Sequence, residues 1–212
     1  MNGNMLRLIV VNGIPAGIQN SIIAVANVFV QSNINQFGAL AMAGCGSYSK
    51  IEGFGFIPVT CFSQALTTFI GQNLGAKEYD RAKKGALFGT ICGIGIAVFF
   101  FSPYLIAAFG GDQRAIEYGI AEAHTIALFY CLLAFSHCMA AIQRGAGRSI
   151  VPMFVMMIVW CGVRVTYISI VIRIIPVINV IYWAYPLTWF ISSVIFLILF
   201  LKTDWIHGLE KQ

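Results

Sequence analysis

Long apolar stretches alternate with short polar or glycine-rich breaks along the whole chain. The breaks fall at 36–38, 71–85, 110–114, 144–149 and 175–179, and they leave six blocks of 20 or more mostly apolar residues. Blocks of that length are typical of membrane-spanning helices, whereas barrel strands need only about 10 alternating residues. The pattern predicts a six-helix transmembrane bundle, with helices at 8–35, 39–70, 86–109, 115–143, 150–174 and 180–201.

Composition supports an all-α polytopic membrane protein that forms a single six-helix lobe. Of the 212 residues, 59% are hydrophobic and 10% are charged, against roughly 25% charged in soluble domains. The six cysteines lie inside apolar blocks without CxxC spacing, so we expect reduced packing residues and no metal or cofactor. No catalytic motif occurs, which argues against an enzyme. The basic pI reflects loops and not a nucleic-acid surface.

Positive charge gathers in alternate breaks, most densely in the run from Gly71 to Gly85. An even number of spans returns both ends of the chain to one side of the membrane. Basic residues of short loops accumulate on the cytoplasmic side, so we expect both termini in the cytoplasm and the chain in the cell (inner) membrane. With that orientation Arg114 and Arg173 lie outside. Nine basic residues lie inside: Arg7, Lys77, Arg81, Lys83, Lys84, Arg144, Arg148, Lys202 and Lys211.

Amide side chains form a stripe along the first predicted helix. Asn20, Asn27, Gln31 and Asn35 are spaced by seven, four and four residues and therefore share one helix face. Gln64 on the second helix is a further polar candidate. Unsatisfied amides in hydrocarbon are costly, so the stripe meets other helices or a water-filled cleft. We favour a substrate cavity lined by these five residues; ordinary interhelical hydrogen bonding is the alternative.

Five ionisable residues fall within the predicted spans. Lys50 is placed near the outer boundary, where a snorkelling role is as well supported as one in a translocation path. Glu52 and Arg164 lie at similar depths and could form a salt bridge, with separate solvation in a cleft as the rival interpretation. His137 is expected to be hydrogen-bonded within the bundle. Glu122 is expected to be water-exposed and is a weaker proton-site candidate.

Three glycines of the third predicted helix repeat every four residues. Gly85, Gly89 and Gly93 form a small-xxx-small ridge, which is typical of close packing between membrane helices. We therefore expect this ridge to contact a neighbouring helix, and we assign it no chemistry.

Several motifs resemble the multidrug and toxic compound extrusion (MATE) family. They are GIPAGIQ (13–19), NVFVQSNIN (27–35), SKIEGFGFIP (49–58), SQALTTFIGQNLGAKEYDRAKKG (63–85) and QRGAGRSIVP (143–152). The resemblance covers nearly the whole chain but only the C-terminal half of such a transporter. It implies an antiporter of two six-helix lobes that exchanges Na⁺ or H⁺ for small, often cationic organic compounds.

The resemblance also implies what this chain lacks. Some members carry coupling carboxylates at places that fall near Ile23 and Leu133, so that site is absent here. A partner is expected, either an N-terminal six-helix lobe or a second copy of the chain. Two alternatives stay open: a truncated lobe that does not transport, and a flippase of lipid-linked sugars with the same two-lobe architecture.

Overall fold

Helices account for all the regular structure in the part of the chain that the computed structural model describes, residues 3–100 and 113–207. The element order is α1 (Gly3–Asn35), α2 (Ala39–Gly75), α3 (Tyr79–Phe100), α5 (Gln113–Ala127), α6 (Tyr130–Gly145), α7 (Ile150–Met156), the π-helical η1 (Met157–Val163), α8 (Arg164–Ile174) and α9 (Asn179–Lys202).

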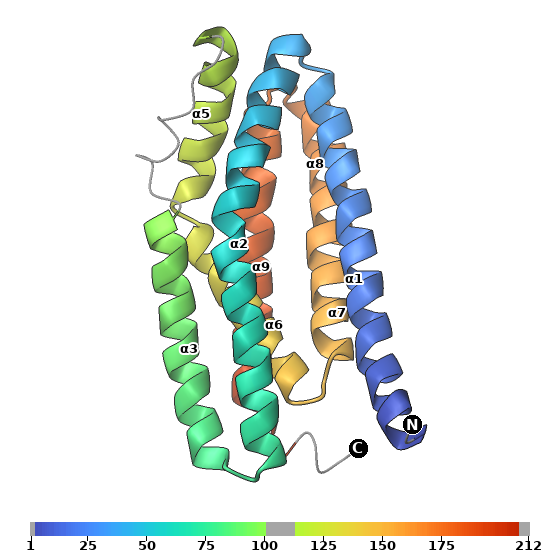
Figure 1. Cartoon of the computed structure of the whole chain (residues 1–212). Helices are drawn as coiled ribbons and strands as arrows, with labels where there is room; N and C mark the ends of the chain where they lie inside the picture. Colours follow the sequence, from blue (N-terminus) through green and yellow to red (C-terminus); the bar gives the residue numbers. More distant parts are fainter. Residues whose placement is uncertain (1–2, 101–112, 208–212) are drawn as a thin grey trace.

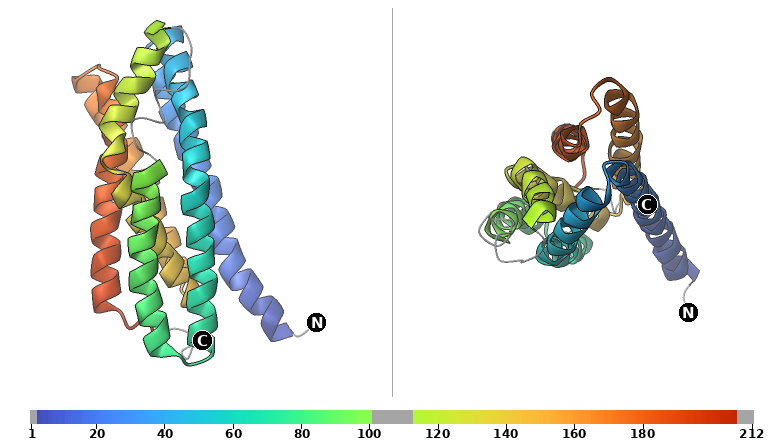
Figure 2. Two further views of the ribbon diagram at one scale, coloured as in Figure 1. Left: turned by 60° about the vertical axis from the view of Figure 1, so that its left-hand side comes forward. Right: turned by 90° about the horizontal axis from the view of Figure 1, so that it is seen from above.

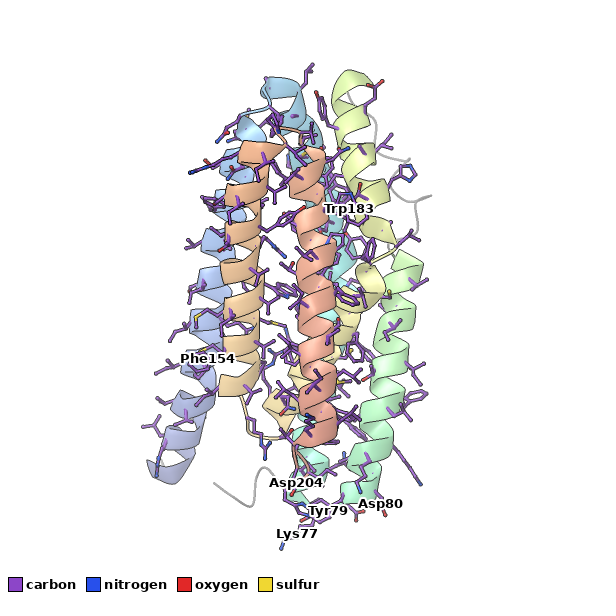
Figure 3. All side chains as sticks on the ribbon, turned by 180° about the vertical axis from the view of Figure 1, so that it is seen from behind. Lys77, Tyr79, Asp80, Phe154, Trp183 and Asp204 are labelled. Atoms are coloured by element: carbon purple, nitrogen blue, oxygen red, sulfur yellow. The ribbon has the colours of Figure 1, made fainter. Side chains whose placement is uncertain are left out.

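The helices run roughly side by side as one elongated bundle (Figure 1). The start of α1, the α2–α3 turn, the α6–α7 turn and the end of α9 lie at one end of the bundle, which we call the basic end (Figure 1). Lys77, Tyr79, Asp80 and Asp204 gather there (Figure 3). The α1–α2 and α8–α9 turns mark the opposite, far end. The N-terminal half of α1 leans away from the other helices (Figure 2).

Four described helical segments are long and apolar enough to cross a bilayer, and the bent pair α5–α6 adds a fifth if it is counted as one span. The remaining predicted span, the third at 86–109, continues into residues outside the described part of the chain. The same is true of most of the predicted break at 110–114, although Gln113 and Arg114 already belong to α5.

The predicted break at 71–85 is too long. Helix α2 continues to Gly75 and α3 begins at Tyr79, so most of this segment is helical. The backbone N–H of Glu78 donates to the Asn73 carbonyl, and Lys77 adopts a left-handed φ of 60°. Such a bond satisfies the otherwise unpaired carbonyls at a helix C-terminus. The polar residues here extend two helices beyond the apolar region instead of forming a long loop.

The predicted helix 115–143 is broken. Helices α5 and α6 meet at Leu128–Phe129 with a bend of 59°. The Thr125 hydroxyl donates to the Ala121 carbonyl one turn earlier, a bond that often bends helices. The predicted helix 150–174 follows one path but contains the π-helical turn η1, which the sequence analysis did not anticipate.

The glycine ridge of α3 packs as predicted. A Cβ at Gly85 would lie 2.0 Å from Phe69, one at Gly89 would lie 2.6 Å from Leu66, and one at Gly93 would lie 2.4 Å from Cys138. Helices α2 and α6 meet through a backbone atom, since a Cβ at Gly145 would lie 2.6 Å from the Thr67 carbonyl oxygen. The three helices α2, α3 and α6 therefore form the tightly packed side of the bundle.

Candidate functional site

A cavity of about 500 Å³ lies between α1, α2 and the helices that face them; we call it the Glu52 cavity. Its polar lining comes from Asn27 and Gln31 on α1, Ser49 and Glu52 on α2, and Arg164 on α8. Much of the remaining lining is aromatic, and these residues are Phe56, Trp160, Tyr185 and Trp189. The cavity therefore offers one carboxylate and one guanidinium among aromatic rings.

Arg164 is held by the helices on which it lies. Its side chain is 2% exposed, and Nη2 donates to the Thr188 hydroxyl at 3.0 Å. The guanidinium carbon lies 4.4 Å from the ring centroid of Tyr185 and 5.7 Å from that of Trp160, which are distances of cation–π contact. The π-helical turn η1 ends directly before Arg164. Such turns are frequent at functional sites, because they change which way the following side chains point.

Glu52 is held by a pair of tyrosines. The Tyr130 hydroxyl donates to Glu52 Oε1 at 3.0 Å and is also hydrogen-bonded to the Tyr48 hydroxyl. Tyr130 is the first residue of α6, so the bend at Leu128–Phe129 places its ring against α2. An acid within this bundle thus has a specific hydrogen-bond donor.

The predicted Glu52–Arg164 salt bridge is not formed. Among the described residues the salt bridge present joins His207 to Asp204, at 2.9 Å. Both Glu52 and Arg164 line the same cavity, but Arg164 is 2% exposed and donates to Thr188, so the rival interpretation of separate solvation does not describe this residue either.

The residues of the predicted amide stripe do not all line the same cavity. Asn27 and Gln31 line the Glu52 cavity, and Gln31 donates to Asn35 at 2.9 Å. Asn35 itself is exposed at the end of α1. Asn20 and Gln64 line a second cavity nearer the basic end.

This second cavity, which we call the His137 cavity, has a volume of about 490 Å³. It lies between α1, α2 and α6, and its lining is mostly polar. Asn20, Gln64 and His137 were predicted candidates, whereas the other polar residues of the lining were not, although Thr60, Gln64 and Thr67 recur at helical spacing. The polar residues that were not predicted are Gln19, Thr60, Ser63, Thr67, Thr68 and Arg144.

An aromatic layer lies between the two cavities. The His137 ring makes edge contacts with Phe56, at a centroid distance of 4.9 Å, and with Trp160, at 5.5 Å. Phe56 and Trp160 line the Glu52 cavity, while His137 lines the other. His137 therefore packs against rings instead of forming the expected hydrogen bond through Nε2, which has no partner.

Two ionisable candidates lie outside both cavities. Lys50 is exposed on α2, as a snorkelling side chain would be. Glu122 on α5 was expected to be wet, and this prediction is wrong: it is 3% exposed, beside Cys45, and its Oε2 has no hydrogen-bond partner. Glu122 therefore faces the interior of the bundle. All six cysteines are free, but only Cys45 and Cys138 are fully buried, and Cys61 is exposed, so the prediction that all six are packing residues is wrong for Cys61.

Known proteins match the chain in sequence and in fold. The family model described as MatE matches residues 15–170. A probable multidrug resistance protein of Bacillus subtilis, YoeA, is 25% identical over 175 residues, which are 78% of this chain and 37% of that protein. A FAD transporter of Shewanella oneidensis is 31% identical over 112 residues, 49% of this chain and 24% of that protein.

Solved structures share the fold. The MATE structure described as the straight conformation superposes with a TM-score of 0.85 at 18% identity, over 100% of this chain and 49% of that one. A MOP superfamily transporter of Pyrococcus furiosus gives 0.83 at 19% identity, over 92% and 44%. The chain thus has the fold of a membrane helical lobe and spans less than half the length of these proteins. Because the family model covers most of its residues, the chain belongs to the MatE family of transporters.

Proposed function

We propose that the chain forms one lobe of a secondary active multidrug exporter. In this proposal, small and often cationic organic compounds leave the cell in exchange for Na⁺ or H⁺, by alternating access between two rigid bundles. The basic end lies in the cytoplasm, together with both ends of the chain, and the lobe resides in the plasma membrane.

The Glu52 cavity is the observation that carries this proposal. It combines the carboxylate of Glu52 with the amides of Asn27 and Gln31 and with a wall of aromatic rings. Aromatic faces and a carboxylate attract organic cations, and aromatic and apolar walls bind varied ring systems without strict geometry. Intramembrane charges that face a cavity are typical of transport pathways. The chemistry therefore fits a site for varied cationic compounds.

A partner lobe is part of the proposal. Asn20, Asn27 and Gln64 are exposed on the side of α1 and α2 that no other described helix covers. In hydrocarbon these amides would lack partners, at a cost of several kcal/mol each. An N-terminal six-helix lobe, or a second copy of the chain, would cover this side and close the cavity.

Coupling is assigned to Glu52 in this scheme. Its carboxylate lines the cavity and already accepts a hydrogen bond from Tyr130. A proton or Na⁺ at this carboxylate would neutralise the charge that holds an organic cation. Ion and substrate would then compete for one group, which is what exchange requires.

Transport into proteoliposomes tests the proposal. The chain is reconstituted with and without an N-terminal lobe, and uptake of a fluorescent cationic dye is followed under a Na⁺ gradient or a pH gradient. We expect gradient-driven transport when the N-terminal lobe is present, and transport by the chain alone would identify a second copy as the partner lobe. Glu52→Gln should abolish it, whereas Lys50→Gln, which changes an exposed residue outside the cavity, should retain it.

Two outcomes would overturn the proposal. Absence of dye transport in either arrangement and under either gradient would leave a truncated, non-transporting lobe. Movement of a lipid-linked sugar without dye transport would assign the lobe to a flippase.

A further inference from the structure

We propose that the His137 cavity is a separate binding site for an anionic phosphate group. The site is distinct from the Glu52 cavity, and binding there requires neither a gradient nor the partner lobe. The lining, the unpaired donors and the barrier between the cavities carry the inference.

The lining of the cavity holds one cationic side chain and no carboxylate. Arg144 contributes a guanidinium, and His137 lies close enough for the two groups to interact electrostatically. The lining contains no carboxylate, and Arg144 has no salt-bridge partner among the described residues. The planar guanidinium binds phosphate oxygens through paired N–H donors.

Several further donors face the same space. His137 Nε2 is buried without a hydrogen-bond partner and donates when it carries the ring proton. The amides of Asn20 and Gln64 line the cavity from α1 and α2. The hydroxyls of Thr67 and Thr68 already donate to carbonyls of their own helix, so they offer only acceptor oxygens. The Ser63 hydroxyl also lines the cavity and is buried without a hydrogen-bond partner. Arg144, His137, Ser63 and the two amides are therefore the groups that would hold the ligand.

The backbone fixes Arg144 beside α2. Gly145, the next residue, packs against the carbonyl oxygen of Thr67 so closely that a Cβ would lie 2.6 Å from it. Thr67 lines the cavity, so this crossing holds the guanidinium-bearing turn at the cavity wall. A preorganised cation loses less entropy when it binds a ligand.

The aromatic layer separates this site from the acid in the other cavity. Phe56, His137 and Trp160 lie between the Glu52 carboxylate and the Arg144 side of the bundle. An anion in the His137 cavity thus approaches Arg144 without lying beside Glu52. The two cavities differ in charge and accept different ligand classes.

Flavin mononucleotide and riboflavin form a matched pair of fluorescent probes, because they differ only in the phosphate. The purified chain is placed in nanodiscs of zwitterionic phosphatidylcholine, and binding is followed by fluorescence anisotropy. We expect flavin mononucleotide to bind at least about tenfold more tightly, since hydrogen bonds to charged groups contribute about 1.5–3 kcal/mol. Equal affinities for the two probes would overturn the proposal.

Variants assign the effect to the cavity. Arg144→Gln should remove the preference for the phosphate, Arg144→Lys should keep part of it, and Lys84→Gln should leave it unchanged, because Lys84 is exposed on α3 and outside the cavity. Each variant is checked by size-exclusion chromatography and thermal unfolding. If Arg144→Gln does not fold, Gln64→Leu provides the same test at an exposed position. If folded Arg144→Gln still prefers flavin mononucleotide over riboflavin as strongly as the unmodified chain does, the proposal is overturned. The same result for Gln64→Leu overturns it if Arg144→Gln does not fold.

A second set of nanodiscs distinguishes the source of the phosphate. Part of the phosphatidylcholine is replaced by phosphatidylglycerol. If phosphatidylglycerol lowers the affinity of the unmodified chain for flavin mononucleotide, and does not lower that of Arg144→Gln, the site is assigned to lipid headgroups. Unchanged affinity assigns it to free organic phosphates, and both results support a phosphate site. This experiment measures binding and not transport. Failure of dye export would therefore not contradict phosphate binding, and failure of phosphate binding would not contradict dye export.

Discussion

The two sides of α2 differ in how they are covered. On one side, glycines of α3 and α6 bring backbones together, and residues such as Leu66, Ile70 and Val59 are almost fully buried. On the other side, α2 and α1 present exposed amides and two polar cavities. One helix therefore serves as the packed core of a lobe and as the wall of a binding surface. We expect changes on the first side to affect mainly stability and changes on the second side to affect the proposed binding.

The strongest test of the packed side is Gly145→Ala. The new methyl group would meet a backbone oxygen that cannot rotate away, so we expect the free energy of unfolding to fall by about 3 kcal/mol, the upper range for overpacking. Thermal or denaturant unfolding in detergent micelles measures it. Gly46→Ala, where nothing lies within 4 Å of the new Cβ, is the matched control and should be neutral or slightly stabilising. Equal effects at the two positions would contradict the contrast.

Tyr130→Phe tests the boundary between the two sides. This change removes the hydroxyl that donates to Glu52 and bonds to Tyr48. Leaving these groups without their partner should cost about 1–3 kcal/mol of unfolding free energy and should also slow export. The control is Tyr167→Phe, a partly exposed tyrosine of α8 outside both cavities. A stable variant with normal export would show that Tyr130 does not position the Glu52 carboxylate.

Gln31→Ala should have the smallest effect on stability and a clear one on function. Gln31 is only partly buried and bonds to the exposed Asn35, so its loss should change unfolding free energy by no more than about 0.5 kcal/mol. Drug resistance of expressing cells should nevertheless fall, since the residue lines the Glu52 cavity. Unchanged resistance in Gln31→Ala and Asn27→Ala is the result expected of a truncated, non-transporting lobe.

Helix ends with a local signal could be predicted from the sequence. Gly38, with φ of 97°, separates α1 from α2. Pro176, which lacks the backbone N–H of a continuing helix, lies between α8 and α9. The bend at Leu128–Phe129 has neither glycine nor proline at the break, and the apolar sequence of η1 does not distinguish a π-helical turn from an α-helical one. The polar run at 71–85 was misread because charged residues at the membrane surface are as compatible with a helix as with a loop.

The candidate sites could be predicted from the sequence only where they depend on the pattern within a single helix. Helical spacing placed the amides of α1 on one face, but spacing along one helix does not tell which cavity each amide reaches. The burial of Glu122 and the position of Arg144 depend on contacts between helices. Glu122 is buried on the helix that precedes the bend, and Arg144 is held by the Gly145 crossing. Such contacts have no counterpart in the periodicity of a single segment.

Water accessibility of α1 in native membranes tests the central claim most directly. Asn27→Cys and Phe190→Cys are made in a cysteine-free background and exposed to a water-soluble, membrane-permeant maleimide. Both positions are exposed in the lobe, but Phe190 is apolar and lies on α9, outside both cavities. If the amide side of α1 lines a water-filled cavity beneath a partner lobe, Asn27→Cys reacts at least about tenfold faster, because the thiolate is the reactive form and a thiol surrounded by hydrocarbon does not ionise. Equally slow reaction at both positions would show that this side faces lipid and would contradict the account.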